Sequence, residues 1–325
     1  MELIHYSYAR VGLMGNPSDG YYGKTISLLI SNFFVKLTLI PNHLKENSKI
    51  SFLKNGDSNN DCDLSFDSLN SLVGISKRFS VHFNTNIPRQ VGFAGSSAII
   101  TAFWKALMNF YNISDENISL PIQANLILSV EKDELKISAG LQDRVVQVYG
   151  GLVYMDFNKD QMIKHGFGIY ERLDINSLPK GLWIAYELNP SDSGKIHSDV
   201  RKRYERGDQK VIDAMKQLIS FTEQARNILI HKNESKRREL AKLMNKNFEL
   251  RREIFGDQIL GQTNLFIIEL ARKYNFAAKF TGSGGAILGL WNGDDDDSTI
   301  LTNIEKLKNE LEKKEIRFCW LIPQE

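Results

Sequence analysis

The chain has 325 residues, of which 42% are hydrophobic and 25% are charged, and this is the composition of an ordinary globular protein. The length predicts roughly two domains and a large buried core. The formal net charge of +2 does not indicate a nucleic acid or a membrane surface as a partner.

The cysteines, the histidines and the apolar runs exclude further classes of protein. Cys62 and Cys319 form no motif, and the six histidines show no metal-ligand spacing. The N-terminus lacks a basic region followed by an apolar run, so we expect no secretory signal. The most apolar stretch, 26–40, is interrupted by Asn32 and Lys36 and is too short to span a bilayer. These observations predict a reduced, cytosolic enzyme.

The N-terminal quarter of the chain reads as strands, a turn and a polar insertion. The mainly apolar segments are expected to form the strands, and the Gly/Asn/Pro/Ser/Asp cluster predicts the turn. The expected elements are a strand (8–14), a turn (15–20), two strands joined near residues 31–32 (24–40), a surface insertion rich in Asn, Lys, Ser and Asp (42–67) and a short helix (68–77).

A loop of small residues, 88–98, lies between an expected strand (79–83) and an expected helix (99–111). Its glycines let the backbone bend and approach a ligand, and Ser96 and Ser97 suit the N-cap position. A helix start offers unpaired N–H groups to a phosphate, and a serine hydroxyl there can ligate Mg²⁺. Such a loop is more often a plain helix cap. It is not a Walker loop, because no Gly-Lys-Ser/Thr ends it. The apolar face expected for the helix comprises Ile100, Phe103, Trp104, Leu107 and Tyr111.

Two acids follow, Glu131 and Asp143. A helix capped by Ser119 is expected to run to about residue 134, with Glu131 near its end. Asp143 begins the next segment (139–149), which turns at two glycines into a strand (152–157). Acids at such spacing are usually solvated surface charges. Beside a phosphate-binding loop, however, they can hold a metal or position a hydroxyl.

The second half predicts a helical layer and a small sheet. Apolar residues repeat at helical spacing over 211–229 and 240–255, which is typical of a core face. The other expected elements are a strand (182–188), a loop (189–194), a helix (263–274), strands (277–281 and 286–291), an acidic turn (294–297), a helix (298–314) and a closing strand (316–322). We expect the domains to divide at 1–178 and 179–325.

Three stretches resemble the motifs of the GHMP kinases in their order along the chain. They are A-R-V-G-L-M-G-N-P-S-D, P-R-Q-V-G-F-A-G-S-S-A and K-F-T-G-S-G-G-A. The resemblance implies an α+β fold, with an N-terminal domain like ribosomal protein S5 domain 2 and a ferredoxin-like C-terminal domain. ATP would lie between them. The nucleotide-binding residues it implies are Pro88, Gly92, Ala94, Gly95, Ser96, Ser97, Ala98, Gly282, Ser283, Gly284 and Gly285.

The same resemblance implies roles for five polar residues. Asp143 matches the catalytic carboxylate, as a general base or as a group that orients the hydroxyl, and Arg10 matches the basic residue near the transferring phosphate. Ser97 and Glu131 match the ligands of Mg²⁺, and Asp19 matches the carboxylate that binds sugar hydroxyls.

The chain departs from the galactokinases at one position of the first motif. Their Glu-His pair falls on Asn16 and Pro17, which removes one carboxylate beside the sugar and suits a negatively charged substrate.

Longer stretches, such as N-P-S-D-S-G-K-I-H-S, resemble the glucuronokinase branch of this family. The resemblance implies transfer of the γ-phosphate of ATP to the anomeric hydroxyl of D-glucuronate. Lys24 and Lys195, followed by Arg201 and Arg203, are candidates for binding the uronate carboxylate. A kinase for galacturonate or arabinose and a catalytically silent sugar sensor remain alternatives, and the oligomeric state stays open. The residues alone indicate a phosphate-binding α+β enzyme.

Overall fold

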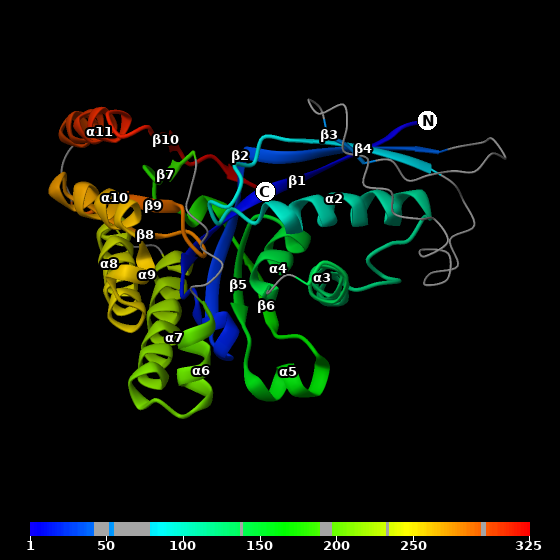
Figure 1. Ribbon diagram of the computed structural model, residues 1–325, viewed down its shortest axis with the longest axis horizontal. Helices are drawn as coiled ribbons and strands as arrows, with labels where there is room; N and C mark the ends of the chain where they lie inside the picture. The colour runs from blue at the N-terminus through cyan, green and yellow to red at the C-terminus, as the bar shows by residue number, and fades with distance from the viewer. Residues whose placement is uncertain (42–51, 55–78, 137–138, 189–196, 232–233, 294–296) are drawn as a thin grey trace.

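A computed structural model describes residues 1–41, 52–54, 79–136, 139–188, 197–231, 234–293 and 297–325 (Figure 1). Most of the expected insertion at 42–67, the short helix at 68–77, the loop at 189–194 and residues 294–296 of the acidic turn lie outside these ranges. So does Lys195. No helix among the described residues is long and apolar enough to cross a membrane.

The first sheet is built on one long strand, β2 (Lys24–Pro41). Strand β1 (Leu3–Met14) pairs antiparallel along one edge of β2. Along the other edge lie, in succession, β5 (Leu152–Asp156), β11 (Pro323–Gln324) and β4 (Phe79–Thr85). The sheet is completed by β3 (Phe52–Lys54), parallel to β4, and by β6 (Ile169–Leu173), antiparallel to β5.

The expected break in residues 24–40 is wrong, because this segment is a single strand of 18 residues. The pairing with β1 shifts where Tyr8 faces Phe34 and Ala9 faces Ile30, so the polar residues there form an irregularity rather than a turn. The Asn32 side chain donates to Trp320 O at 2.8 Å and accepts from Ile322 N at 2.9 Å. The C-terminal segment therefore satisfies the polar residue that resembled a turn.

Three helices, α2 (Gly95–Phe110), α3 (Leu120–Ser129) and α4 (Leu141–Tyr149), lie on one side of this sheet in Figure 1. A π-helical turn, Val130–Glu134, extends α3 and contains Glu131. The first helix begins four residues earlier than expected, at Gly95. Its closely packed face is made of the small residues Ala98, Ala102 and Ala106, while the large apolar residues expected on that face are half-buried. Helix α5 (Lys159–His165) was not predicted.

The second sheet has the strand order β10-β7-β9-β8, with all neighbours antiparallel. Its strands are β7 (Trp183–Glu187), β8 (Phe276–Phe280), β9 (Ala286–Trp291) and β10 (Ile316–Trp320). The helices of this half are α6 (His197–Glu205), α7 (Gln209–Ile230), α8 (Lys236–Phe255), α9 (Asp257–Leu260), α10 (Gln262–Lys273) and α11 (Asp297–Glu312). The α+β fold class is confirmed.

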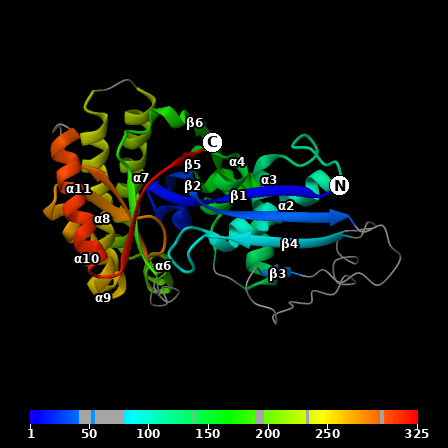
Figure 2. The ribbon, with the colours of Figure 1, turned by 90° about the horizontal axis from the view of Figure 1, so that it is seen from above.

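Both faces of the second sheet are buried, and this joins the two halves of the molecule. Trp183 and Ala185 pack in one core with the helices, whereas Leu182 and Ile184 pack in a core shared with the first sheet. The chain changes sheets between β6 and β7, close to the predicted division at 178, which stays a prediction. After β10 the chain returns to the edge of β2 (Figure 2).

Candidate active site

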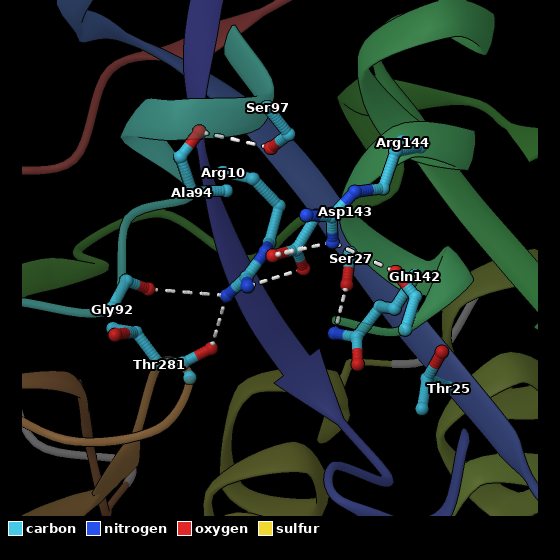
Figure 3. Close-up of polar contacts among 12 residues, drawn as sticks. Arg10, Thr25, Ser27, Gly92, Ala94, Ser97, Gln142, Asp143, Arg144 and Thr281 are labelled. Carbon is cyan, nitrogen blue, oxygen red and sulfur yellow. Dashed lines mark hydrogen bonds and ion pairs between the residues drawn. The ribbon is translucent and has the colours of Figure 1, made fainter. Parts of the chain in front are cut away.

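Arg10 brings together segments that are far apart in the sequence (Figure 3). It lies on β1 and is 5% exposed. Its Nη1 donates to Gly92 O at 3.2 Å and to Thr281 O at 2.9 Å, and its Nη2 donates to Asp143 Oδ1. One guanidinium therefore contacts the expected acid and both of the glycine-rich stretches.

These stretches are the first glycine loop (residues 88–98) and the second glycine loop (residues 281–285, between β8 and β9), and they touch each other. A Cβ on Gly92 would lie 2.9 Å from Gly284 O, and a Cβ on Gly282 would lie 2.6 Å from Gly92 O. Gly92 also has a φ of 76°. Both positions therefore require glycine, because a side chain would push the two backbones apart.

The first glycine loop ends in the N-terminus of α2. Ala94 is the residue before the helix, with a φ of 60°. Its carbonyl accepts from Ser97 Oγ, Gln147 Nε2 and Ala98 N, each at 3.1 Å. Ser96 and Ser97 thus lie in the first turn, and their expected place at the N-cap is wrong. The opening N–H groups of α2 have no partner within the helix and present a positive dipole end to an anion.

Glu131 has no exposed surface and is held by two residues. Ser96 Oγ donates to its Oε1 at 2.7 Å, and Arg144 donates to its Oε2 from both Nε and Nη2. Arg144 Nη1 also donates to Gly140 O at 2.8 Å and lies 3.5 Å from Asp143 Oδ2. The sequence assigned no role to Arg144, although its position next to Asp143 was the available signal.

Arg144 keeps its charge in this setting. Burial and the nearby charge of Arg10 lower the pKa of Arg144 to about 9, so it is a cation at neutral pH. It therefore balances the buried carboxylate of Glu131 and links that residue to Asp143.

The two expected magnesium ligands differ in how open they are to an ion. Glu131 supplies the oxygen chemistry that Mg²⁺ prefers, but both of its oxygens already accept hydrogen bonds. Ser97 is buried and donates its proton to Ala94 O, which leaves its lone pairs to accept. Within the described ranges no group of three His, Cys, Asp or Glu side chains forms a metal cluster. A magnesium ion at Glu131 would thus compete with Arg144.

Asp19 and Asn16 lie beside these residues. Asp19 is on the short 3-10 helix η1 (Ser18–Tyr21), where a Cβ on Gly140 would come 3.0 Å from its Oδ2. Burial and the charge of Asp143 raise the pKa of Asp19 to about 7, and Arg10 partly opposes this shift. Asn16 is 4% exposed, and no described residue is a partner of its Nδ2.

Lys279, on β8, ties the first motif to the second sheet and was also not singled out from the sequence. It is 1% exposed, and its Nζ donates to Gly12 O and Asn16 Oδ1 at 2.8 Å and to Phe280 O at 2.6 Å. Burial, with the charges of Arg251 and Arg10, holds the pKa of Lys279 well below its usual value.

The candidates for the uronate carboxylate are engaged with acids where the structure describes them. Lys24 Nζ lies 2.6 Å from Glu223 Oε1 and 3.1 Å from Asp156 Oδ2. Arg201 pairs with Glu205 at 3.1 Å, and Arg203 pairs with Asp208 at 2.9 Å. Among the described residues, Lys24 therefore pairs with Glu223 and Asp156 and makes no hydrogen bond or ion pair with Asp143. Its role as a sugar ligand stays a prediction, as does that of Lys195.

Comparison with known proteins decides the family. Residues 64–151 match the protein family described as "GHMP kinases N terminal domain". Glucuronokinase 1 of Arabidopsis thaliana is 44% identical over 311 residues, which cover 87% of this chain and 83% of that protein. The chain belongs to the glucuronokinase family of the GHMP kinases. As a member of that family it is a sugar kinase that uses ATP, and the expectation of a kinase is confirmed.

Solved structures confirm the fold of this glucuronokinase-family chain. The mevalonate kinase of Methanococcus jannaschii superposes with a TM-score of 0.71 at 20% identity, covering 99% of this chain and 98% of that one. The galactokinase of Lactococcus lactis, solved with galactose, has a TM-score of 0.73 at 15% identity and coverages of 99% and 93%. At these identities the likeness concerns the fold.

Proposed function

We propose that the chain transfers the γ-phosphate of ATP to the anomeric hydroxyl of D-glucuronate, giving D-glucuronate 1-phosphate and ADP. The observation that carries this proposal is the set of contacts made by Arg10, which join Asp143 to Gly92 O and Thr281 O. Phosphoryl transfer needs a place for the nucleotide phosphates and a group that positions the attacking hydroxyl, and these contacts put both within one side chain's reach.

In this proposal Asp143 positions the sugar hydroxyl and accepts its proton. Its carboxylate is held by Arg10 on one oxygen and lies 3.5 Å from Arg144 on the other, so it cannot rotate freely. A carboxylate fixed in this way is ready for the hydroxyl without reorganisation. In the same proposal the Arg10 guanidinium stabilises the negative charge that builds up on the transferring phosphate.

The sugar would lie against Asp19 and Asn16. Asp19 is next to the start of α4, and the amide nitrogen of Asn16 has no partner among the described residues, so both can bind hydroxyl groups. With Asn16 and Pro17 in place of the Glu-His pair of galactokinases, this side carries fewer acids. A substrate with its own carboxylate is therefore tolerated better than in a site with that extra charge.

The product belongs to the class of sugar 1-phosphates that nucleotidyl transfer consumes, and we propose that it supplies UDP-glucuronate synthesis. We also propose that Mg²⁺ accompanies the nucleotide, where it would neutralise charge on the phosphates. Glu131 and Ser97 are the residues that would hold it. The cytosolic location expected from the sequence stays a prediction.

An ADP-coupled assay with a panel of free sugars tests the proposal. D-Glucuronate should give the highest kcat/KM, and the phosphate of the product should be coupled to the anomeric proton in NMR spectra. Galactose, arabinose and galacturonate are the competitors. Equal or faster turnover of any of these would reject glucuronate as the substrate, and absence of turnover with all four sugars would favour the sugar sensor.

A further inference from the structure

Arg251 is a fully buried cation that belongs to none of the sequence motifs and has no part in the proposed mechanism. It lies on α8 and is 1% exposed. Arg10 and Arg144 each contact a carboxylate, whereas no described carboxylate lies within 4 Å of the Arg251 guanidinium. Its guanidinium carbon lies 4.4 Å from the centre of the Phe280 ring, and its Nε has no partner among the described residues. Placing an unpaired charge in the interior is costly, so this arrangement calls for a physical reason.

The contacts that Arg251 does make are with the second glycine loop. Its Nη1 donates to Gly282 O at 2.8 Å, and its Nη2 donates to Ser283 O at 3.0 Å. The two ends of one guanidinium therefore hold two successive carbonyl groups toward α8. A planar, charged fork is suited to this task, because both bonds form without further side-chain ordering.

Fixing these carbonyls also fixes the N–H groups behind them. In a trans peptide the C=O and N–H point in opposite directions, so the N–H groups of Ser283 and Gly284 point away from Arg251. They face the first glycine loop: a Cβ on Gly92 would lie 3.3 Å from Ser283 N and 3.4 Å from Gly284 N. No acceptor for either N–H group occurs among the described residues. The next one, Gly285 N, does have an acceptor, Asn264 Oδ1 at 3.2 Å.

Arg251 also brings charge to this place. Burial lowers the pKa of Arg251 to about 10, and the charge of Asp19 partly opposes this shift, so Arg251 remains a cation at neutral pH. The positive charge lies behind the peptide groups whose N–H ends open toward the first glycine loop. An anion on that side would meet two aligned N–H donors with a buried cation behind them, which is a favourable electrostatic arrangement.

We propose that Arg251 is a positioning residue for the polyphosphate of the nucleotide: it orients the second glycine loop and supplies a positive charge that pairs with no described carboxylate and that the phosphates balance. This inference rests on the proposed kinase function for the identity of the ligand. It does not depend on which sugar is the acceptor.

Arg272 provides a matched control. It lies on α10, its guanidinium carbon is 4.8 Å from the Phe248 ring, and its Nε also has no partner among the described residues. Its other contacts are with Glu249 and Asn245 rather than with the glycine loop. Replacing Arg272 therefore removes a ring contact of the same kind without touching the loop.

The test compares the binding of ADP and of adenosine to the full-length chain by calorimetry, without sugar. Arg251→Gln should weaken ADP binding by roughly 10- to 100-fold, the loss expected when charge-assisted bonds are removed, and should leave adenosine binding within about twofold. Arg251→Lys keeps the charge but not the fork and should fall between. Arg272→Gln should leave the ratio of the two affinities unchanged.

The inference would be overturned if the ratio of ADP affinity to adenosine affinity were unchanged in both Arg251 variants, whether neither affinity fell or both fell equally. If Arg251→Gln does not fold, Arg251→Lys decides the matter alone, since it keeps the buried charge and the volume of the stem. If the chain does not phosphorylate glucuronate but the Arg251 variants show the expected fall in this ratio, the sugar assignment is rejected and the role of Arg251 stands.

Discussion

The two glycine loops meet at one place but are built differently. The first is followed by α2, whose N-terminus supplies unpaired N–H groups and a positive dipole end. The second joins two antiparallel strands, β8 and β9, and no helix follows it. There Arg251 fixes the carbonyls and provides the charge. If both loops bind the nucleotide as proposed, one takes its positive potential from a helix terminus and the other from a buried side chain.

The two loops also differ in how the charge beside them is balanced. Beside the first loop, Glu131 is neutralised by Arg144 within the protein. Behind the second loop, no described acid lies close enough to pair with Arg251. We infer that the first loop is balanced before a nucleotide arrives, whereas the second is balanced by the nucleotide. Arg10 connects the two, because it contacts a carbonyl at each loop and Asp143.

The largest effect is expected at Asp143, which lies against Arg10 between the loops. Asp143→Asn should lower kcat by about 10²- to 10⁴-fold, because a general base is lost while the shape of the side chain is kept. ADP affinity should stay within about threefold, since neither loop loses a donor. Steady-state kinetics and calorimetry measure the two quantities. Full activity in the variant would remove Asp143 from the reaction.

Arg144→Gln tests whether the first loop is balanced internally. Breaking a buried pair leaves an uncompensated carboxylate and should lower the free energy of unfolding by about 3–5 kcal/mol. Mn²⁺ without nucleotide should then raise the Tm of the variant more than that of the parent chain, because the ion replaces the lost cation at Glu131.

Arg226→Gln is the matched control for that change. Arg226 also donates Nε and Nη2 to one carboxylate oxygen, of Glu171, but these two side chains are 31% and 43% exposed. Its loss should lower the free energy of unfolding by at most about 1 kcal/mol, with no response to Mn²⁺. Equal losses in the two variants would contradict the burial argument.

Gly92→Ala should separate the loops. The new Cβ would lie 2.9 Å from Gly284 O, at a φ of 76°. The left-handed conformation alone costs about 1–2 kcal/mol for a residue with a Cβ, and relief of the contact would move the second loop. Chemical unfolding and the KM for ATP measure both effects. Gly20→Ala is the control, because nothing lies within 4 Å of its Cβ; similar losses at both positions would mean that contact between the loops is unimportant.

The sequence predicted the first loop better than the second for a physical reason. A strand, a glycine-rich bend and a helix leave a local pattern, so residues 88–98 indicated an anion site before any family was considered. Ser96 and Ser97 were expected at the N-cap but lie in the first turn, because Ala94 takes the left-handed position that opens α2. The second loop looked like a plain link between strands, since the side chain that makes it electropositive, Arg251, lies 31 residues earlier in the sequence than Gly282.

Hydrogen bonds between residues far apart in the sequence also explain the main error in the predicted fold. Ser31 and Asn32 have the composition of a turn, and local pattern gives no sign that Asn32 binds the backbone of residues 320 and 322. Lys24 is a similar case: its place after the first motif suggested a sugar ligand, while Asp156 and Glu223 come to it from β5 and α7. Polar residues that find partners across the fold resemble turns or ligands when read locally.

The effect expected to appear only as a change with pH concerns Asp19, whose charge acts on both Arg144 and Arg251 and so on both loops. Burial and Asp143 raise its pKa from 3.8 to about 7 in the folded chain. Between these values the folded state binds more protons than the unfolded one, so this carboxyl makes stability fall as pH rises through that window. Asp19→Asn should remove that fall. When urea unfolding is measured across this pH window, the stability of the parent chain relative to the variant should therefore decrease as pH rises.

Asp208→Asn is the control and should show no such trend above pH 5, because the Arg203 bond lowers the pKa of Asp208 and that group stays ionised. A flat difference for Asp19 would mean that its carboxyl is solvated and acts on neither loop.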